Sequence, residues 1–554
     1  MRTRLLVSLA AASFIAGACS VQDFVSPEEG NPQGVELEFV AQFNGVDTKT
    51  EMQSDETTIL WTRNDAVSIF YGSSSTGSLF TAIDDEDHFK AAHFRGTLEA
   101  FTGLNESGSY NQFWAVYPYD KAVSCDGESV VVSLPAVQAA KGGSFADGIN
   151  ISIARSPGLA LSFYNTCSWF MFSLEHEDIK SVVFKGNNGE DVAGTFVETF
   201  GDNGRPTAPT IIDGEKQVVL NAPEGEYFKS GQYYFITLLP QVFNSGFSLT
   251  FISDDTILEL NYPDAAEFVR SEYWKTTEWD HYATKFTVLH YTGTGGSVYP
   301  NNTSTLDATL DSFEYDESTG KGTLIFRGEL TTIGEDSFAG CGTLKTITIP
   351  ETVKTIGPLA FARCRNLESI TIPEGVTAIG SRAFFNTGLT SITIPASVDD
   401  IGETVFGNCS KLASIVVNPG NEYYDSRNGC NALIEKSKNK LIVGCKNSII
   451  PDTVTSIGDY AFQLLDGLTS ITIPASVTAL GERVFYHCTG LTVVTFKSRN
   501  PPEGGEGLFA ECYKLQESNN NNVHIYVPYT SSVNKFKEKA SSWMFNSSIL
   551  EAIN

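Results

Sequence analysis

Motifs of common catalytic and metal sites are missing from this chain of 554 residues. None of its seven histidines stands in an H-E-x-x-H pattern, and neither a G-x-S-x-G elbow nor a C-x-x-C pair occurs. The glycine-rich segment 291–297 lacks the Lys-Ser/Thr pair of a phosphate-binding loop. We therefore predict a protein that is not an enzyme and needs no metal and no cofactor. Only a glycosidase-like carboxylate pair escapes this search, because its two members lie far apart in sequence.

Basic residues are few. Lys and Arg number 37 against 66 Asp and Glu, and the formal net charge is −29. A surface this acidic repels phosphate backbones, so we expect no nucleic-acid partner. Long apolar runs are also lacking. After the first 19 residues, no stretch reaches the roughly 18 consecutive apolar residues of a membrane span. The chain nevertheless has 41% hydrophobic and 12% aromatic residues, enough for the cores of several domains.

The start of the chain has the layout of an export signal. Two arginines precede a short apolar run, and small residues lead to Cys19. This ending resembles a bacterial lipobox, although Ala16 stands where leucine is usual. The resemblance implies that residues 1–18 are a lipoprotein signal peptide, and that lipidated Cys19 anchors the protein in the outer membrane, facing outward. The alternative is ordinary cleavage without lipidation. Residues 19–34 are polar, with Pro and Gly, and indicate a flexible tether.

A repeat fills the second half of the chain. An Ile-Gly or Leu-Gly pair recurs at steps of 22 or 23 residues, with one step of 56, and a Phe follows each pair. With the one that closes the series, the repeat phenylalanines are Phe338, Phe361, Phe384, Phe406, Phe462, Phe485 and Phe509. A strand that ends in Pro comes next, with Ile inward and Thr outward. No single repeat can bury its apolar face alone, so stacked repeats must form a solenoid.

This pattern resembles the BspA-like class of leucine-rich-repeat surface proteins. The resemblance covers about residues 320–550, within a predicted solenoid domain of residues 301–554. The step of 56 residues matches an inserted hairpin of that class, with two strands in the segment 431–445. The resemblance also implies a short C-terminal capping helix, which covers the open end of the solenoid with Phe536 and Trp543.

The outward strand position of the solenoid is the candidate binding site. It holds Thr348, Thr371, Thr393, Val416, Thr472 and Thr495. Stacked rungs about 4.8 Å apart would align these hydroxyl and methyl groups on one flat face of roughly 40 Å. Solenoids commonly bind partners on such extended faces. The alternative is purely structural, because Thr is a good solvent-facing strand residue in any sheet.

Five of the ten cysteines stand three residues after a repeat Phe. They are Cys341, Cys364, Cys409, Cys488 and Cys512, and Thr387 and Leu465 replace them in two repeats. This interchange favours a packing position over a disulfide ladder or a metal site. Two other pairs are the better disulfide candidates in an exported protein, namely Cys430 with Cys445 and Cys125 with Cys167.

The first half of the chain is predicted to be β-rich. Short alternating strands separated by Gly, Asn and Asp turns extend to about residue 285, and no amphipathic helix of normal length interrupts them. The pattern predicts two β-sandwich domains, at residues 35–157 and 158–288. We expect a Gly-rich hinge at residues 289–300 to connect them to the solenoid.

Several phrases in this half resemble the fimbrillin-like proteins of surface fimbriae. They include WTRND at 61–65, AVYPY at 115–119 and LPAVQ at 134–138. In that family an extended strand of one subunit completes the sheet of the next after cleavage at an arginine, so the resemblance makes homo-polymerisation by strand addition one option. Two departures favour a plain stalk: the first arginine after the signal is Arg63, inside one of these phrases, and the chain continues into the solenoid.

Together these features predict a mainly β, lipid-anchored protein of the cell surface. The function that the repeat resemblance implies is adhesion or recognition, with the solenoid binding proteins or glycans on host or neighbouring cells. One alternative is a structural anchor or tip subunit of a fimbria, which predicts ladder-like oligomers. Another is a glycan-capture protein of a nutrient-uptake system, which predicts saturable polysaccharide binding on aromatic platforms.

Overall fold

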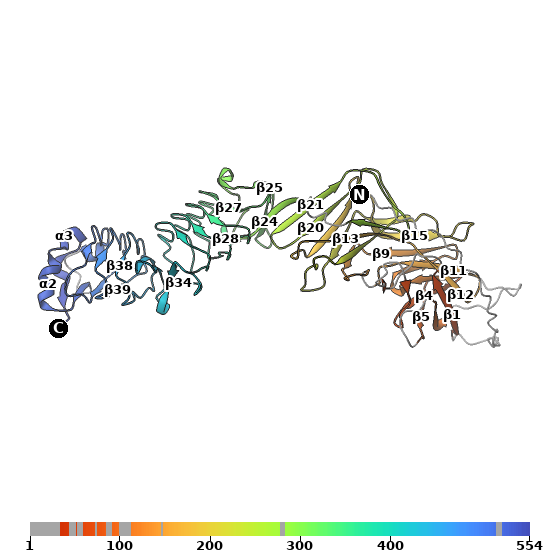
Figure 1. Ribbon diagram of the computed structural model, residues 1–554, viewed down its shortest axis with the longest axis horizontal. Helices are drawn as coiled ribbons and strands as arrows, with labels where there is room; N and C mark the ends of the chain where they lie inside the picture. Colours follow the sequence, from red (N-terminus) through yellow and green to blue (C-terminus); the bar gives the residue numbers. More distant parts are fainter. Residues whose placement is uncertain are drawn as a thin grey trace.

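The described part of the chain is mainly β, as predicted, and elongated (Figure 1). The computed structural model describes residues 34–43, 51–52, 59–72, 75–84, 91–98, 112–145, 148–276, 283–516 and 523–553. Cys19, the predicted signal peptide and nearly all of the predicted tether lie outside the described residues. Within these ranges no helix is both long and apolar enough to cross a bilayer.

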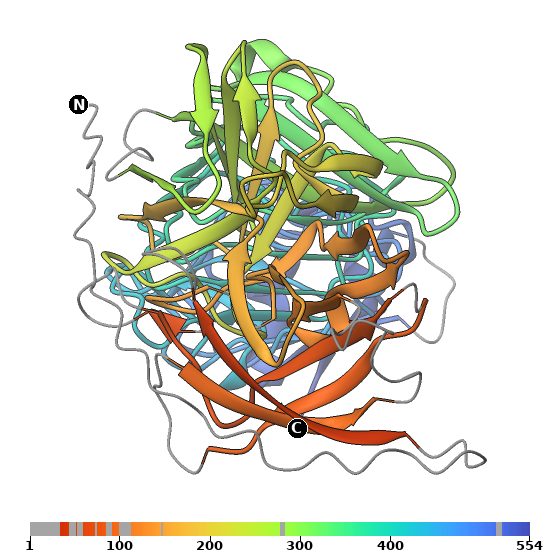
Figure 2. The same ribbon diagram turned by 90° about the vertical axis from the view of Figure 1, so that its right-hand side faces the viewer.

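The N-terminal strands close into a barrel, seen toward the viewer in Figure 2. Its strands, in spatial order, are β1 (Val35–Phe43), β12 (Ala160–Asn165), β11 (Ser152–Ser156), β7 (Phe113–Tyr117), β4 (Ala66–Tyr71), β5 (Ser78–Ala82) and β6 (Ala91–Leu98). β1 closes the barrel, because it pairs antiparallel with β6 and parallel with β12. This differs from the predicted first sandwich, which would leave open sheet edges where the barrel has none.

The next unit takes strands from both sides of the predicted boundary at residues 157 and 158. β8 (Ala122–Cys125), β9 (Ser129–Leu134), β15 (Ala193–Thr199) and β16 (Thr210–Glu215) form one sheet. β10 (Val137–Ala139) pairs in parallel with β17 (Gln217–Asn221). Residues 122–139 therefore belong to the second unit, because their partners and the apolar core around Val130 and Val132 lie there.

Two sheets of this unit pack face to face across phenylalanine rings. One contains β18 (Tyr233–Leu238), β13 (Ser168–Ser173) and β23 (Tyr273–Thr276), and the other contains β14 (Ser181–Gly186), β20 (Phe247–Ile252) and β21 (Thr256–Tyr262). The ring centroids of Phe170 and Phe184 lie 5.6 Å apart. Those of Phe172 and Phe251 lie 6.4 Å apart. Such buried aromatic side chains dominate the packing energy of a core.

One strand, β24 (Thr284–Gly293), joins this unit to the repeats. One edge of β24 pairs first with β21 and then with β28 (Leu344–Thr348), the first long strand of the solenoid. Its other edge pairs with β26 (Lys321–Arg327), which pairs in turn with β25 (Thr309–Asp316). The first residues of the predicted hinge, 289–293, are therefore hydrogen-bonded within a sheet, and the expected flexible connection is not observed there.

The repeats stack their long strands in parallel. These strands are β28, β30 (Ser369–Thr371), β32 (Ser391–Ile394), β34 (Ser414–Val417), β39 (Ser470–Ile473), β41 (Val493–Phe496), β43 (His524–Val527) and β44 (Leu550–Ala552). The repeat phenylalanines stack inside, with 5.3 Å between the ring centroids of Phe338 and Phe361 and 5.6 Å between those of Phe361 and Phe384. Within each run of consecutive repeats, the stacked rings supply the interior that no single repeat has.

The predicted hairpin occupies the long step between repeats. It consists of β36 (Ala432–Glu435) and β37 (Lys440–Gly444). Leu433 and Val443 belong to the core of the first repeats, whereas Ile434 and Leu441 belong to the core of the last ones. Gly444 lies against Phe462, where a Cβ atom would come within 2.1 Å of the ring. The hairpin therefore divides the interior of the solenoid into two apolar cores.

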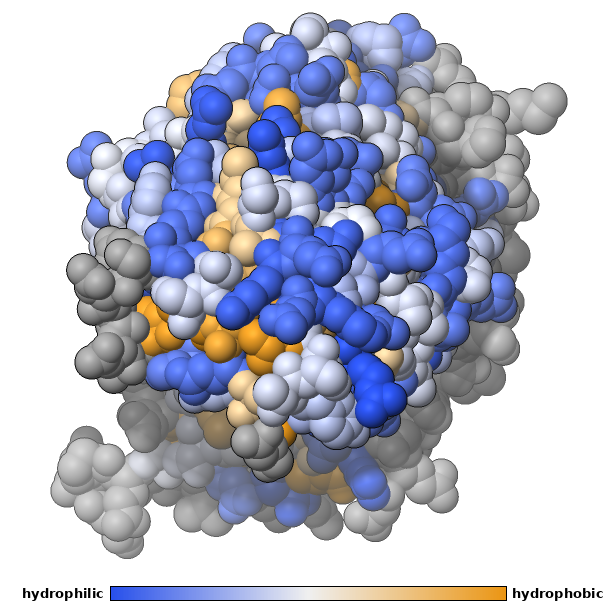
Figure 3. Space-filling view, turned by 90° about the vertical axis from the view of Figure 1, so that its left-hand side faces the viewer, coloured by the Kyte–Doolittle hydropathy of each residue, from blue (hydrophilic) through white to orange (hydrophobic). Residues whose placement is uncertain are grey.

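Short helices cover the C-terminal end of the solenoid, which Figure 3 shows as a largely hydrophilic surface. They are α2 (Thr530–Lys537) and α3 (Ala540–Trp543). Phe536 and Trp543 are buried, with ring centroids 4.9 and 5.5 Å from that of Phe496. The indole N–H of Trp543 donates to the carbonyl of Gly504 at 2.9 Å. The last open rung is thus closed by side chains that the sequence had marked for this role.

Candidate functional site

The predicted outward row lies on the long strands of the solenoid, in three blocks. Its members pair as Thr348 with Thr371, Thr393 with Val416, and Thr472 with Thr495. All are exposed except Thr495, which is half-buried. The first two blocks belong to consecutive repeats, but the segment between β34 and β39, which contains the inserted hairpin, separates the third from them.

A second outward column runs beside the predicted one. It lies two positions earlier in each strand and contains Thr346, Ser369, Ser391, Ser414, Ser470, Val493 and His524. Side chains two residues apart share one face of a strand, so the repeat pattern already contained this signal. With both columns, the face is two residues wide and carries mostly small hydroxyl side chains.

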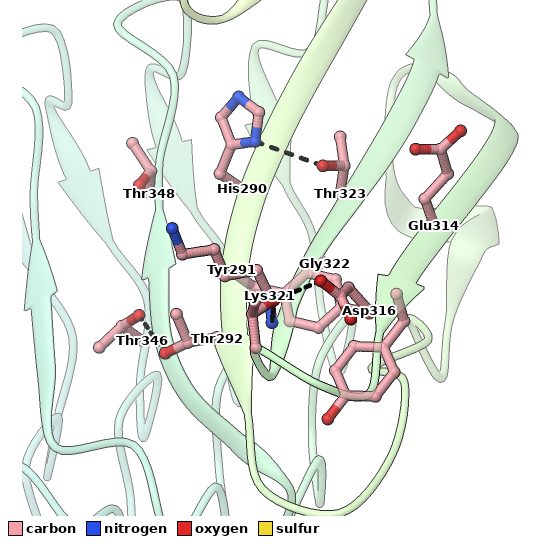
Figure 4. A pocket seen from close by; sticks show the side chains of 12 residues that line it. His290, Tyr291, Thr292, Glu314, Asp316, Lys321, Gly322, Thr323, Thr346 and Thr348 are labelled. Carbon is pink, nitrogen blue, oxygen red and sulfur yellow. Dashed lines mark hydrogen bonds between the residues drawn. The ribbon is translucent and has the colours of Figure 1, made fainter.

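The polar face continues beyond the repeats onto β24, β26 and β25. Glu314 pairs with Thr323, which pairs with His290, and these side chains extend the column of Thr348. In the same way Asp316, Lys321 and Thr292 extend the column of Thr346, as Figure 4 shows. Sequence reasoning missed this extension because a glycine-rich segment was taken as a hinge.

An open cleft of about 680 Å³ hollows the face where β24, β25, β26 and β28 meet. The buried ring of Tyr291 lies under it and passes over Gly322, where a Cβ atom would come within 2.1 Å of the ring. Tyr291 is parallel to Tyr315, with 6.2 Å between ring centroids, and its hydroxyl accepts a hydrogen bond from the N–H of Val298 at 3.0 Å. The cleft is therefore built on fixed side chains.

Hydrogen bonds fix several of the polar groups in the cleft. The carboxylate of Asp316 accepts from the N–H and hydroxyl of Ser318 and from the hydroxyl of Thr319, at 2.6 to 2.8 Å. These bonds lower the pKa of Asp316 to about 2, so it stays ionised. Nδ1 of His290 lies 3.4 Å from the hydroxyl of Thr323.

The remaining polar groups give the cleft both signs of charge. Glu314 and Lys321 are exposed on neighbouring strands, together with the hydroxyls of Thr323 and Thr348. Such a set of donors and acceptors can hydrogen-bond a polar chain laid across the strands. Among the residues that the structure describes, no group of three or more His, Cys, Asp or Glu side chains could hold a metal ion.

The cysteines of the repeats form hydrogen bonds to the main chain. Each buried thiol donates to the carbonyl of the preceding repeat Phe, at 3.0 Å for Cys364, 3.0 Å for Cys409, 2.9 Å for Cys488 and 2.8 Å for Cys512. Burial raises the pKa of Cys364 and of Cys512 to about 12. Each of these four thiols therefore donates to a main-chain carbonyl of the preceding turn, a role that the sequence did not reveal.

The two predicted disulfides are not formed in the structure, where all four cysteines are free. Cys430 donates to the carbonyl of Ala432 at 3.6 Å, and Cys445 donates to the carbonyl of Asn431 at 3.3 Å. The thiols of Cys125 and Cys167 are likewise buried, and burial raises the pKa of each to about 11. Each of these thiols packs in a core instead of bridging to its predicted partner.

Comparison with known proteins identifies the repeats. The sequence model of the family described as BspA type leucine rich repeat region matches residues 331–438 and 433–537, in six copies. No curated protein is similar enough to match.

Several solved structures resemble parts of the chain. A leucine rich cell surface protein of Faecalibacterium prausnitzii is 28% identical, with a TM-score of 0.30, and the match covers 40% of this chain and 63% of that one. A leucine-rich repeat protein of Eubacterium ventriosum is 23% identical, with a TM-score of 0.27, over 36% and 65% of the two chains. A Bacteroides ovatus protein, provisionally named for cell adhesion, is 12% identical, with a TM-score of 0.28, over 46% and 96%. The chain thus spans less than two thirds of the first two proteins.

Proposed function

We propose, from the BspA-type leucine-rich repeat region at residues 331–537, that this is a recognition protein of the cell surface. Its binding surface is the outward strand face, from β25 across β24 to the long strands of the repeats. The observation that carries the proposal is the register of β24, which places Thr323 and His290 in line with the outward threonines. The face is therefore longer than the repeats alone, and its cleft provides a defined point of contact.

The chemistry of this face fits a polar macromolecule. Two columns of hydroxyl side chains offer both donors and acceptors along the sheet, with the charged groups of the cleft at one end. The strands that carry them are fixed by ladder hydrogen bonds and by the core beneath. Little conformational entropy is then lost from this side when a ligand binds. We propose proteins or neutral glycans as ligands, since a net charge of −29 disfavours polyanions.

The rest of the chain serves as anchor and stalk in this proposal. Lipidation of Cys19 would hold the protein on the outer membrane, and the barrel and the second unit would raise the repeats away from it. Polymerisation is the second candidate. The structure disfavours it in one respect, because β1 is paired along both edges, and an incoming strand could take its place only after β1 had left the barrel.

The test is binding by the intact chain, because a cut near residue 290 would pass through β24 and break the shared sheet. The protein and a variant with Thr371→Lys, Thr393→Lys and Thr472→Lys are presented to arrays of matrix proteins, bacterial surface proteins and glycans. We expect the variant to lose at least about tenfold in affinity for any ligand of this face, because three lysines obstruct one extended contact.

A matched control carries the same added charge elsewhere. Thr377→Lys, Ser437→Lys and Ala475→Lys change exposed residues outside the two outward columns. This variant should bind as the parent does. Equal binding by all three proteins would contradict the proposal and move recognition to another surface, and formation of ladder-like oligomers by the parent would favour the fimbrial alternative.

A further inference from the structure

β25 is the last strand of its sheet and has an open edge. In the described chain it pairs with β26 alone, and its burial pattern shows that nearly every residue from Thr309 to Asp316 is exposed. Unpaired N–H and C=O groups on such an edge form a template for another strand. Natural proteins often shield such edges with proline, with lysine or with a β-bulge. β25 contains neither proline nor lysine, and its register shift lies between Leu310 and Ser312, so the segment from Phe313 to Asp316 pairs regularly with β26.

The two faces of β25 differ in chemistry. On the face shared with the cleft stand the carboxylates of Glu314 and Asp316. On the opposite face the ring of Phe313 is 48% exposed and meets that of Tyr299, itself 51% exposed, with centroids 5.7 Å apart. A strand added at this edge would place alternate side chains beside the carboxylates and beside the two rings.

We propose that the edge of β25 binds an extended segment of a partner protein in which basic and apolar side chains alternate. Main-chain hydrogen bonds to β25 would supply the part of the affinity that does not depend on the partner's sequence. The side chains would determine which partner sequences bind. Basic residues would lie opposite Glu314 and Asp316, and apolar residues opposite Phe313. This site goes beyond the proposed outward face, because its ligand would bind through main-chain hydrogen bonds at the edge of the sheet.

Charge argues against a second copy of the chain as the occupant. Two β25 strands paired with each other would bring the acidic side chains of both copies close together. Like charges in such positions destabilise strand pairing. Arg327 neutralises Asp311 within its own sheet, at 2.9 Å, but no ion pair of Glu314 or Asp316 with Lys or Arg is found among the described residues. The edge therefore selects a basic strand and repels its own copy.

The experiment measures binding of a fluorescent eight-residue peptide of alternating Lys and Val to the intact protein by anisotropy. We expect saturable binding, and we expect the same peptide with every main-chain nitrogen methylated not to bind, because it has no donors for the ladder. Hydrogen–deuterium exchange should slow in residues 309–316 when the unmodified peptide is added. Equal binding of both peptides would overturn the proposal, because attraction between charges alone would then account for it.

Two substitutions locate the site. Glu314→Lys should weaken peptide binding by about fivefold through the loss of an opposite-charge pair, and Phe313→Ser should weaken it by a similar factor. Glu224→Lys makes the same charge change at an exposed residue of the second unit and should have no effect. Unchanged binding by Glu314→Lys would contradict the proposal. So would concentration-dependent dimers of the parent that Phe313→Ser abolishes, since the occupant would then be a second copy.

Discussion

Glu198 shows how far the environment of a single residue can differ from its sequence context. It lies on β15 with no solvent exposure, and Nη2 of Arg270 donates to both of its carboxylate oxygens, at 3.0 and 3.2 Å. Burial raises the pKa of Glu198 to about 7, against the opposing attraction of Arg270. Nothing in the alternating strand sequence of β15 distinguishes this glutamate from an exposed one, since the two residues meet only through the fold.

The first prediction concerns the stability of the protein between pH 4.5 and pH 7. In this window the folded state keeps the proton on Glu198, while the unfolded state, with a pKa near 4.5, releases it. The free energy of unfolding should therefore fall as the pH rises, by up to about 3 kcal/mol from this group. Urea denaturation at pH 5 and pH 8 measures it. Glu198→Gln should remove this part of the pH dependence, and an unchanged dependence would show that Glu198 titrates normally.

At the scale of the element, the repeats were the most predictable part of the chain. The spacing of Ile-Gly, Phe and Ile-Thr-Ile-Pro predicted the long strands, because every repeat has the same pattern of inward and outward residues. The two strands of the hairpin and the buried roles of Phe536 and Trp543 were also readable. The hydrogen bond from each of the four buried repeat cysteines to a Phe carbonyl was not, because it depends on the offset between neighbouring turns. Cys364, for example, donates to Phe338 of the previous repeat.

The second prediction is that the repeat cysteines react according to their exposure. Cys341 is half-buried, whereas Cys364, Cys409, Cys488 and Cys512 are buried. At pH 8 iodoacetamide should therefore modify Cys341 first and the other four only as the protein unfolds, because the thiolate is the reactive form. Mass spectrometry of peptides taken along a urea titration measures the order. Rapid labelling of Cys364 in the folded protein would be incompatible with its burial and raised pKa.

At the scale of the whole molecule, the sequence predicted a string of separate domains, and the structure joins them. The strands of residues 122–139 cross into the second unit, and β24 belongs to the second unit and to the repeats at once. Pairing between segments this far apart leaves no local signal, since alternation shows that a strand exists and not which strand it meets. For the same reason, only the part of the candidate site on the repeats was predicted from the sequence. Its part on β25 and β26 was missed, because no local signal shows that these strands join the same sheet.

The third prediction is that β24 holds the two halves of the protein in a fixed relation. Thr292→Pro removes a main-chain donor where β24 pairs with both β26 and β28, and should broaden the distribution of distances between the second unit and the repeats. Small-angle scattering, or distances between two spin labels, would report it. Ser297→Pro, in the loop after the strand, is the control and should leave the distribution narrow. A broad distance distribution in the parent protein would contradict this prediction and support the flexible hinge that the sequence predicted.

The division of the solenoid interior has a mechanical consequence if the protein is anchored through Cys19, as we propose. Packed blocks that are joined in series bear the same tension, and the less stable block unfolds first. The core before the hairpin and the core behind it are separate, since Leu433 faces one and Ile434 the other. A pull on the distal repeats would load both blocks in series, whereas a pull on the cleft at β24 would bypass the distal block. The place on the outward strand face where a ligand binds would therefore decide which of the two cores carries the load.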